Sequence, residues 1–286
     1  MTTFSTPEPI SVTLEFGFGD ARIIASDRDD TVVQVRPSDA SHQPDMRAVE
    51  QTRVEYAAGR LLVKATKSRG LGLFAKPGSI DVTIDVPACS NLQGDAAVAA
   101  FRGVGQLGEC RVKAGAGDIQ FDETGTLDLN TGGGAIVVDR VLGRADVSSG
   151  SGQVRIRDIA GAAVIKLANG DCWVGTTTGA LRVSAANGDI SVDHAHADIT
   201  AHTAGGDVRI GDVARGSASL KTACGEIEIS IRSGSAARLD VHTSFGRVRN
   251  HMDRAESPDA SDERIDVRAR TGYGDILIHR AEGAMP

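Results

Sequence analysis

Acidic residues recur at one position of a repeated sequence. That position directly follows a glycine, and it reads Asp118, Ala135, Gln153, Asp171, Asp189, Asp207 and Glu226. If the repeats stack at the spacing of β-strands, about 4.8 Å, neighbouring carboxylates repel each other unless something compensates. The compensation is either hydrogen bonds from turn amides or a divalent cation bridging Asp171, Asp189 and Asp207. We favour the amides, because calcium-binding β-rolls use a different motif, G-G-x-G-x-D.

A single tryptophan stands in another column of the repeat. Trp173 shares an outward position with Arg155 and Arg209, and with Gln120 and Ser191. An exposed indole beside arginines can stack on a sugar or anchor a protein partner. The alternative, in which Trp173 tucks under a loop, stays open. We name Trp173, Arg155 and Arg209 as candidates for partner binding.

The stretch 67–79 (KSRGLGLFAKPGS) combines basic residues with apolar ones. Leu73 and Phe74 are its candidates for contact with a partner or a membrane surface. An ordinary loop folded onto the sheet explains the same composition, and it is the simpler explanation.

Histidines gather at His194, His196 and His202, with Asp193 and Asp198 nearby. Two histidines at i, i+2 on one strand face can hold a metal ion. These two lie at a corner after a strand, and the sequence shows no fixed third ligand. We therefore expect a solvated corner and no bound metal.

Catalytic motifs do not emerge from the sequence. It contains no G-x-S-x-G, H-E-x-x-H or P-loop pattern. The recurring G-x-G-D lies in a turn between strands with no helix after it, so it does not form a phosphate cradle. We therefore expect a protein that is not an enzyme and uses no cofactor.

A repeat of 18 residues must position all of these side chains. Its anchor glycines are Gly117, Gly134, Gly152, Gly170, Gly188, Gly206 and Gly225, with looser copies at Gly246 and Gly274. On both sides of each anchor, apolar and polar residues alternate, which is the pattern of β-strands. The polar positions include Lys113, Asn130, Ser148, Lys166, Ser184, His202, Lys221 and His242. The period predicts an all-β, single-stranded parallel β-helix, or β-solenoid, in which equivalent strands stack; we expect a right-handed coil.

The repeat does not extend over the whole chain. Residues 1–88 are rich in strand patterns but out of register, and we expect them to cap the first end, partly with antiparallel strands. Residues 89–286 form the predicted solenoid. It is interrupted by an acidic loop at 250–264 and ends with a terminal coil at 265–280.

The composition of the chain indicates which partners are disfavoured and in which cellular compartment the protein is expected. The chain has 286 residues and a net charge of −7, which argues against nucleic acid as a partner. No run of 18 apolar residues suggests a membrane span, and the first residues do not resemble a secretory signal. None of the four cysteines is in C-x-x-C spacing, and Cys110 and Cys172 fall in inward columns. We expect buried free thiols and a cytoplasmic protein.

The repeat units resemble a known group of proteins. The segments AGAGDIQF, AANGDISV and TAGGDVRI, the opening TPEPISVTLEFGFGDARIIASDR and the closing IDVRARTGYGDILIHRA resemble an uncharacterised bacterial β-strand-repeat family common in actinobacteria. That family is grouped with the putative adhesin (head GIN-type) domains. The resemblance covers nearly the whole chain, and it implies a β-solenoid fold with no established activity.

Our hypothesis from the sequence is a non-enzymatic interaction scaffold that binds a protein partner or itself. One alternative is an adhesin-like surface module that binds carbohydrate or protein. A second is a β-helix enzyme acting on polysaccharide, which would need acidic and basic side chains that converge in a groove.

Overall fold

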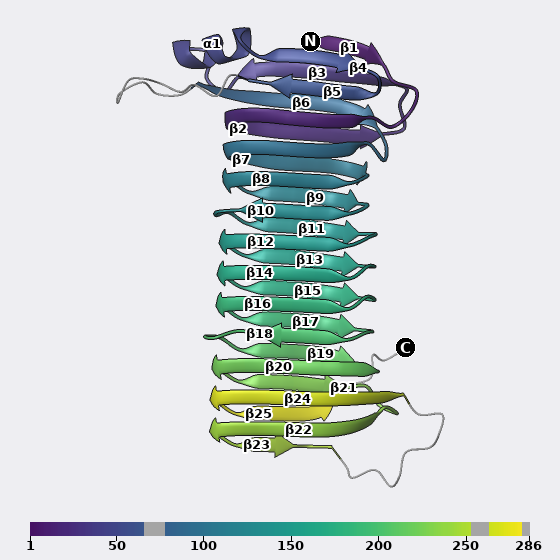
Figure 1. Cartoon of the computed structure of the whole chain (residues 1–286), viewed down its shortest axis with the longest axis vertical. Helices are drawn as coiled ribbons and strands as arrows, with labels where there is room; N and C mark the ends of the chain where they lie inside the picture. The colour runs from purple at the N-terminus through teal and green to yellow at the C-terminus, as the bar shows by residue number, and fades with distance from the viewer. Residues whose placement is uncertain (66–77, 253–262, 282–286) are drawn as a thin grey trace. The chain divides into compact units, whose positions relative to one another are not determined.

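The computed structural model describes residues 1–65, 78–252 and 263–281, and almost all of its elements are β-strands (Figure 1). The chain divides into two compact units, Met1–Gly143 and Arg144–Pro286. The elements of the first unit are β1 (Thr2–Ser5), β2 (Ser11–Ser26), β3 (Asp30–Pro37), α1 (Gln43–Glu50), β4 (Arg53–Ala57), β5 (Arg60–Lys64), β6 (Ser79–Pro87), β7 (Asn91–Leu107), β8 (Cys110–Ala116), β9 (Ile119–Thr124), β10 (Leu127–Thr131) and β11 (Ile136–Val141).

The second unit continues the same pattern of paired short strands. Its elements are β12 (Ala145–Ser151), β13 (Val154–Ile159), β14 (Ala163–Asn169), β15 (Cys172–Thr177), β16 (Leu181–Asn187), β17 (Ile190–Ala195), β18 (Ile199–His202), β19 (Val208–Val213), β20 (Gly216–Cys224), β21 (Ile227–Ile231), β22 (Ala236–Phe245), β23 (Val248–Asn250), β24 (Arg264–Tyr273) and β25 (Ile276–Arg280).

One coil consists of two strands joined by a glycine turn. In the second unit, β14 and β15 flank Gly170, and β16 and β17 flank Gly188. Each strand pairs in parallel with the strand one coil further on, and the partners, such as Ile165 and Val183, are 18 residues apart. The predicted parallel β-solenoid with coils of 18 residues is therefore confirmed.

The anchor glycines stack because no other residue fits their position. Gly170 has a φ of +126°, and a Cβ added to it would lie 2.2 Å from the carbonyl oxygen of Gly152. Gly188 stands in the same relation to Gly170. A side chain at either position would clash with backbone and would also require a disfavoured φ. The regular period of the sequence is therefore imposed by the turn.

The interior is a narrow apolar column with hydroxyl groups near its turns. Ile165, Val183 and Ile190 are fully buried, as the alternation predicts. Buried threonines precede several of the glycine turns; Thr222, for example, donates a hydrogen bond of 2.9 Å to the carbonyl oxygen of Gly206. This bond satisfies a backbone acceptor that would otherwise be buried without a partner.

The first unit begins with a long strand that forms a whole coil. β2 bends at Gly19 (φ +134°), and β7 pairs with it in parallel on both sides of the bend. On its other edge β2 pairs in parallel with β5 and β6. β2 therefore lies between β5–β6 and β7, although it precedes both in the chain. Residues 11–26, predicted as part of the cap, thus already form a solenoid coil.

Antiparallel strands and one helix cover the outer edge of this first coil. β3 pairs antiparallel with β6, β1 with β3, and β4 with β5. The helix α1 lies between β3 and β4, within residues 1–88, where only strands are expected from the sequence. Among the described residues of 1–88, antiparallel pairing is therefore limited to β1, β3 and β4 and their partners β5 and β6, and one helix lies beside them.

In the second unit the order of the last coils in space differs from their order in the chain. β24 pairs in parallel with β20 on one edge and with β22 on the other. β25 likewise lies between β21 and β23, and Figure 1 shows these two yellow strands between green ones. The expectation that the coil at 265–280 ends the stack is wrong. The coil formed by β22 and β23 is outermost.

Candidate functional site

The column of acidic residues forms a ladder of hydrogen bonds to backbone amides. Asp171 Oδ1 accepts a bond of 3.0 Å from the amide of Asp189, whose own Oδ1 accepts one of 2.8 Å from the amide of Asp207. Asp207 Oδ1 accepts from Glu226, and Asp118 Oδ1 from Ala135. The predicted turn-amide alternative is therefore confirmed. Within residues 1–65, 78–252 and 263–281, no group of three or more His, Cys, Asp or Glu is placed to hold a metal ion.

Trp173 lies on the outward face of the second unit and contacts its own neighbours. The Arg155 guanidinium carbon lies 5.2 Å from the centroid of the indole ring. The indole Nε1 donates a bond of 3.2 Å to Asp193 Oδ1, and the ring passes over Gly175, which has no side chain to obstruct it. Trp173 is half-buried against the sheet itself, with Arg155 above its ring.

The other predicted partner-binding residues do not join Trp173. Arg209 is separated from it by the strand that carries Ser191, and it pairs with Asp207 at 2.9 Å and with Glu228 at 3.6 Å. Leu73 and Phe74 lie outside the described residues. The structure therefore brings Trp173 and Arg155 together, and a role for any of these residues in partner binding stays a prediction.

The histidines near residue 200 occupy separate environments. His194 Nδ1 lies 3.5 Å from a carboxylate oxygen of Asp212, which Arg232 also binds. Asp198 accepts hydrogen bonds from the amide and hydroxyl of Ser217. His202 lies on another outward column, between Ser184 and Lys221 on the adjacent strands. The structure does not unite these side chains into one site.

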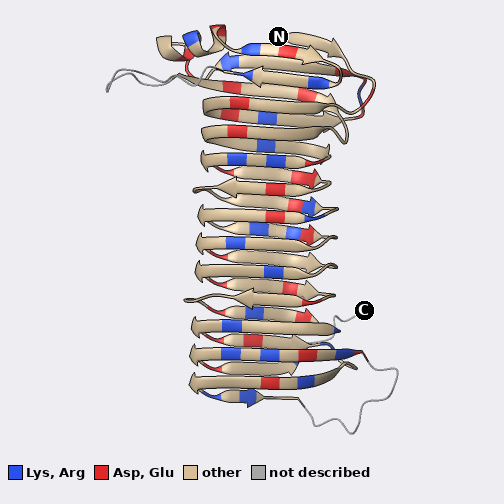
Figure 2. Ribbon diagram, viewed as in Figure 1, with Lys and Arg blue, Asp and Glu red and all other residues tan. Residues whose placement is uncertain are grey.

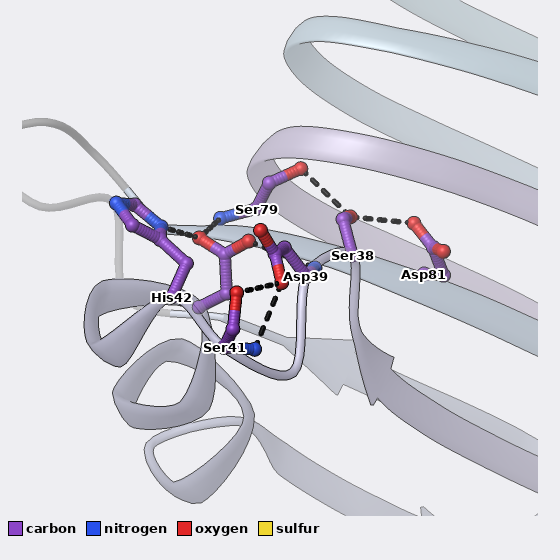
Figure 3. A network of polar contacts seen from close by, with 7 residues as sticks. Ser38, Asp39, Ser41, His42, Ser79 and Asp81 are labelled. Atoms are coloured by element: carbon purple, nitrogen blue, oxygen red, sulfur yellow. Dashed lines mark hydrogen bonds and ion pairs between the residues drawn. The ribbon is translucent and has the colours of Figure 1, made fainter.

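A polar network around α1 was not expected from the sequence (Figure 3). The buried carboxylate of Asp45 accepts bonds from the amides of Ser79 (3.0 Å) and Asp39 (3.1 Å), and it lies 2.7 Å from His42 Nδ1. Burial acts to raise the pKa of Asp45, but these hydrogen bonds outweigh burial, and the pKa lies below its ordinary value. The network fixes α1 to the start of β6. Pro44 in the first turn of the helix was the available sequence signal.

Beside this network lies an open groove of about 750 Å³ on the first unit. Its lining includes Asp20, Asp81 and Asp118, the hydroxyls of Ser38 and Ser79, and backbone of the glycine turns. Asp20 Oδ1 and Asp118 Oδ1 each accept a hydrogen bond from an amide of the next coil, at 3.3 and 2.8 Å. Asp81 accepts a bond from the Ser38 hydroxyl at 2.6 Å. These carboxylates therefore serve the turns and the cap.

The outermost coil of the second unit exposes positions that are buried elsewhere. Val248 is 43 % exposed, whereas Ile276, which occupies the same inward position on the adjacent coil, is 0 % exposed. Phe245 and Tyr273 are both exposed and stack with a centroid distance of 4.8 Å and an interplanar angle of 8°. In the described part of the chain, β22 and β23 pair only with β24 and β25, so each has one free edge.

Comparison with known proteins identifies the family. Residues 11–213 match the Toastrack DUF4097 family. The chain belongs to this family. The family match over residues 11–213 confirms the resemblance of the sequence to an uncharacterised β-strand-repeat family. No curated protein matches the chain significantly. No helix in the described residues has the length and apolar character needed to cross a membrane.

Several solved structures are similar to the Toastrack chain. A putative adhesin from Parabacteroides merdae is 14 % identical with a TM-score of 0.44, and the match covers 98 % of this chain and 95 % of that one. A putative lipid binding protein from Parabacteroides distasonis is 11 % identical with a TM-score of 0.36, covering 98 % and 96 %. A putative adhesin from Bacteroides fragilis is 14 % identical with a TM-score of 0.27, covering 97 % and 95 %.

Proposed function

We propose that this Toastrack protein is a non-enzymatic interaction scaffold that binds a protein partner at the open end of its second unit. The observation that carries the proposal is the exposure of Val248 at a position that is fully buried in the adjacent coil. In a solenoid each coil covers the apolar face of the next, so the last coil needs a cover. A partner that supplies this cover gains the burial of apolar surface.

The free edges of β22 and β23 suit the addition of a strand. An unpaired strand edge presents backbone N–H and C=O groups that pair with an extended segment of another chain. The stacked rings of Phe245 and Tyr273 stand beside this edge, and exposed aromatic side chains are frequent anchors of protein interfaces. Backbone pairing would provide affinity, and the rings and Val248 would select the side chains of the partner.

Two further features support, in turn, a role without catalysis and a location in the cytoplasm. The acidic residues that the repeat places in a row are used in hydrogen bonds to turn amides, which gives them a structural purpose. Cys110 and Cys172 are buried free thiols, and free thiols are typical of proteins in a reducing compartment.

The adhesin-like surface module is the second candidate, in keeping with the names of two of the structures above. It differs from the scaffold in its location. Cell fractionation with an antibody against the native protein separates the two: protein on the cell surface supports the adhesin-like module, and protein in the cytosol supports the scaffold.

The test of the scaffold uses a photo-reactive amino acid at position 248, and at position 98 as a matched control. Val98 lies on the first unit and is 46 % exposed, close to the value for Val248. We expect a defined cross-linked protein from position 248 alone, and its loss when Phe245→Ser is added. Equal cross-linking from both positions, or none, would overturn the proposal. If the cross-linked species is a second copy of the chain, sedimentation will show concentration-dependent association, and self-association replaces the protein partner.

A further inference from the structure

The second unit carries a face on which positive side chains stack from coil to coil. Five parallel strands, β14, β16, β18, β20 and β24, are adjacent in that order. Two outward positions on each strand form two columns across this sheet. The first column reads Lys166, Ser184, His202, Lys221 and Arg270, and the second reads Val164, Arg182, Thr200, Ser219 and Arg268. We call these ten residues the basic face.

No acidic residue belongs to the basic face. Figure 2 shows blue segments on β14, β16, β20 and β24, where these lysines and arginines lie. Lys166, Arg182 and Lys221 are exposed and form no ion pair with any described residue. Their charges are therefore available to a ligand, although the chain as a whole carries a net charge of −7.

The basic face meets carboxylates at its margins. Asp146 on β12 lies opposite Val164 and pairs with Arg144 at 3.3 Å, and Asp266 lies two residues before Arg268 on the same face of β24. Asp240 on β22 lies opposite Arg268 and binds Arg270 with both oxygens at 2.8 Å. The hydrogen bond from Arg270, and then the charges of Arg270, Arg268 and Arg238, hold the pKa of Asp240 below its ordinary value. The three carboxylates that border the face are fewer than its five lysines and arginines, so positive charge remains in excess.

The pKa of His202, which lies within the basic face, is lowered by burial and by the same excess of positive charge. It lies between Ser184 and Lys221, with Arg182 on the next strand. Burial lowers its pKa first, and the charges of Lys221 and Arg182 lower it further. An anion bound to the face would therefore be attracted by groups that have no internal partner.

We infer that the basic face binds a linear anionic polysaccharide that carries carboxylate or sulfate groups and runs across the strands. Cations on strands about 4.8 Å apart match a chain with repeated anionic groups, and the five strands span about 19 Å. Arginine binds carboxylate and sulfate oxygens with two parallel hydrogen bonds. The hydroxyls of Ser184, Thr200 and Ser219 lie between the cations, and each can donate to or accept from sugar hydroxyls.

Other polyanions fit the basic face less well. Single-stranded nucleic acids stack their bases on aromatic side chains, and neither column contains a Phe, Tyr or Trp. Double-stranded DNA attracts proteins chiefly through a large excess of positive charge, whereas this chain is acidic overall. A membrane surface would favour apolar side chains beside the cations, and here the intervening residues are mainly hydroxyl-bearing.

The test measures binding of the full chain to a heparin oligosaccharide and to polygalacturonate, with dextran as the neutral probe and duplex DNA as the competing polyanion. The variant Lys166→Gln/Arg182→Gln/Lys221→Gln removes three unpaired charges. The matched control Lys64→Gln/Arg111→Gln/Lys113→Gln removes three charges from the first unit. We expect the first variant to weaken binding about tenfold or more, and the control less than about twofold. Binding should also weaken when salt rises from about 50 to 200 mM.

Charge-retaining substitutions show whether weaker binding comes from the lost charges or from a loss of folding. The variant Lys166→Arg/Lys221→Arg should keep its affinity within about threefold, because both positions stay positive and Arg182 keeps its two parallel hydrogen bonds. Equal loss in the glutamine variant and its control, or no binding of either anionic probe by the wild-type chain, would overturn the inference. Binding to dextran of equal strength would refute the role of charge, and stronger binding to duplex DNA would refute the polysaccharide. A preference between heparin and polygalacturonate distinguishes sulfate from carboxylate.

Discussion

The two units repeat the same coil, yet their outward faces use charge differently. In the first unit, cations lie beside carboxylates: Lys64 pairs with Glu15 at 2.6 Å, and Arg111 with Asp128 at 3.1 Å. On the basic face of the second unit, by contrast, Lys166, Arg182 and Lys221 have no carboxylate opposite them on either neighbouring strand. Adjacent strands in a solenoid lie about 4.8 Å apart. A charged residue at an outward position therefore forms an ion pair directly across the strands only if the residue one coil away carries the opposite charge.

The outer edges of the coils in the two units also differ, because those of one unit are covered and those of the other are not covered by any described residue. β6 is covered by β3, and α1 is fixed beside it through Asp45. β22 and β23 have no partner on their outer edges in the described part of the chain. β6 is thus paired on both edges, whereas the outer edges of β22 and β23 and the cations Lys166, Arg182 and Lys221 have no partner among the described residues. Coils of one geometry can therefore carry surfaces whose charges are paired and surfaces whose charges are unpaired.

The largest expected effect is on the reaction rates of the cysteine thiols. It concerns the interior, where the two units are alike. Burial raises the pKa of Cys110 in the first unit and of Cys172 in the second to about 12. Since the thiolate is the reactive form, both should react with a thiol reagent at pH 8 about a thousandfold more slowly than the exposed Cys89 and Cys224. The absorbance of released thionitrobenzoate checks this, with denatured protein as the control. Rapid reaction of all four native thiols would contradict a common closed core.

Removal of the buried carboxylate that fixes the cap should be the next largest effect. Asp45→Ala leaves the amides of Ser79 and Asp39 without an acceptor, and we expect a loss of about 3 kcal/mol in the free energy of unfolding. Asp240→Ala, at the open end, should leave the urea midpoint nearly unchanged because that ion pair is exposed.

The dependence on pH follows from the lowered pKa of Asp45. A carboxyl group with a depressed pKa in the folded chain stabilises it above the ordinary pKa of about 4, and this contribution is lost as the pH falls through the folded value. Urea titrations at neutral pH and in acid should therefore show the difference between wild type and Asp45→Ala shrinking in acid. A difference independent of pH would contradict this origin.

One substitution at equivalent positions tests the covered coil against the open one. Val82 on β6 and Val248 on β23 both occupy the second position after the turn, but Val82 is 1 % exposed and Val248 is 43 % exposed. Val82→Ala should cost about 2 kcal/mol, and Val248→Ala less than about 0.5 kcal/mol, in chemical denaturation. Equal costs would mean that the end of the second unit is covered.

The smallest expected effect concerns His202 on the basic face. Lys221→Gln removes one of the two charges that disfavour its protonation, so the pKa of His202 should rise toward its ordinary value. A titration of the imidazole resonance by NMR measures this shift, and Lys113→Gln on the first unit is the control. An unchanged pKa in the Lys221 variant would contradict the mutual repulsion of these side chains.

Much of the fold could be predicted from the sequence because the turn admits only glycine. The 18-residue period, the alternation and the inward positions of Cys110 and Cys172 follow from contacts between neighbouring coils. The amide ladder of the acidic column was also predictable, since an Asp beside a turn finds an amide one coil away. Arg155 was expected beside Trp173, but the bond from the indole to Asp193 was not, because Asp193 stands in a different column of the next coil.

By itself, then, the sequence determined the coil: its length, its inward and outward positions and the glycine at each turn. These depend on interactions that recur with the period and are therefore written into every copy. The tertiary structure alone decided the order of the coils at the two ends, with β2 placed between β6 and β7 and β24 placed between β20 and β22. All the coils offer nearly the same strand edges for pairing. Which strands become neighbours therefore depends on packing between residues far apart in the chain. This packing determines which strand edge and which charged side chains stay exposed.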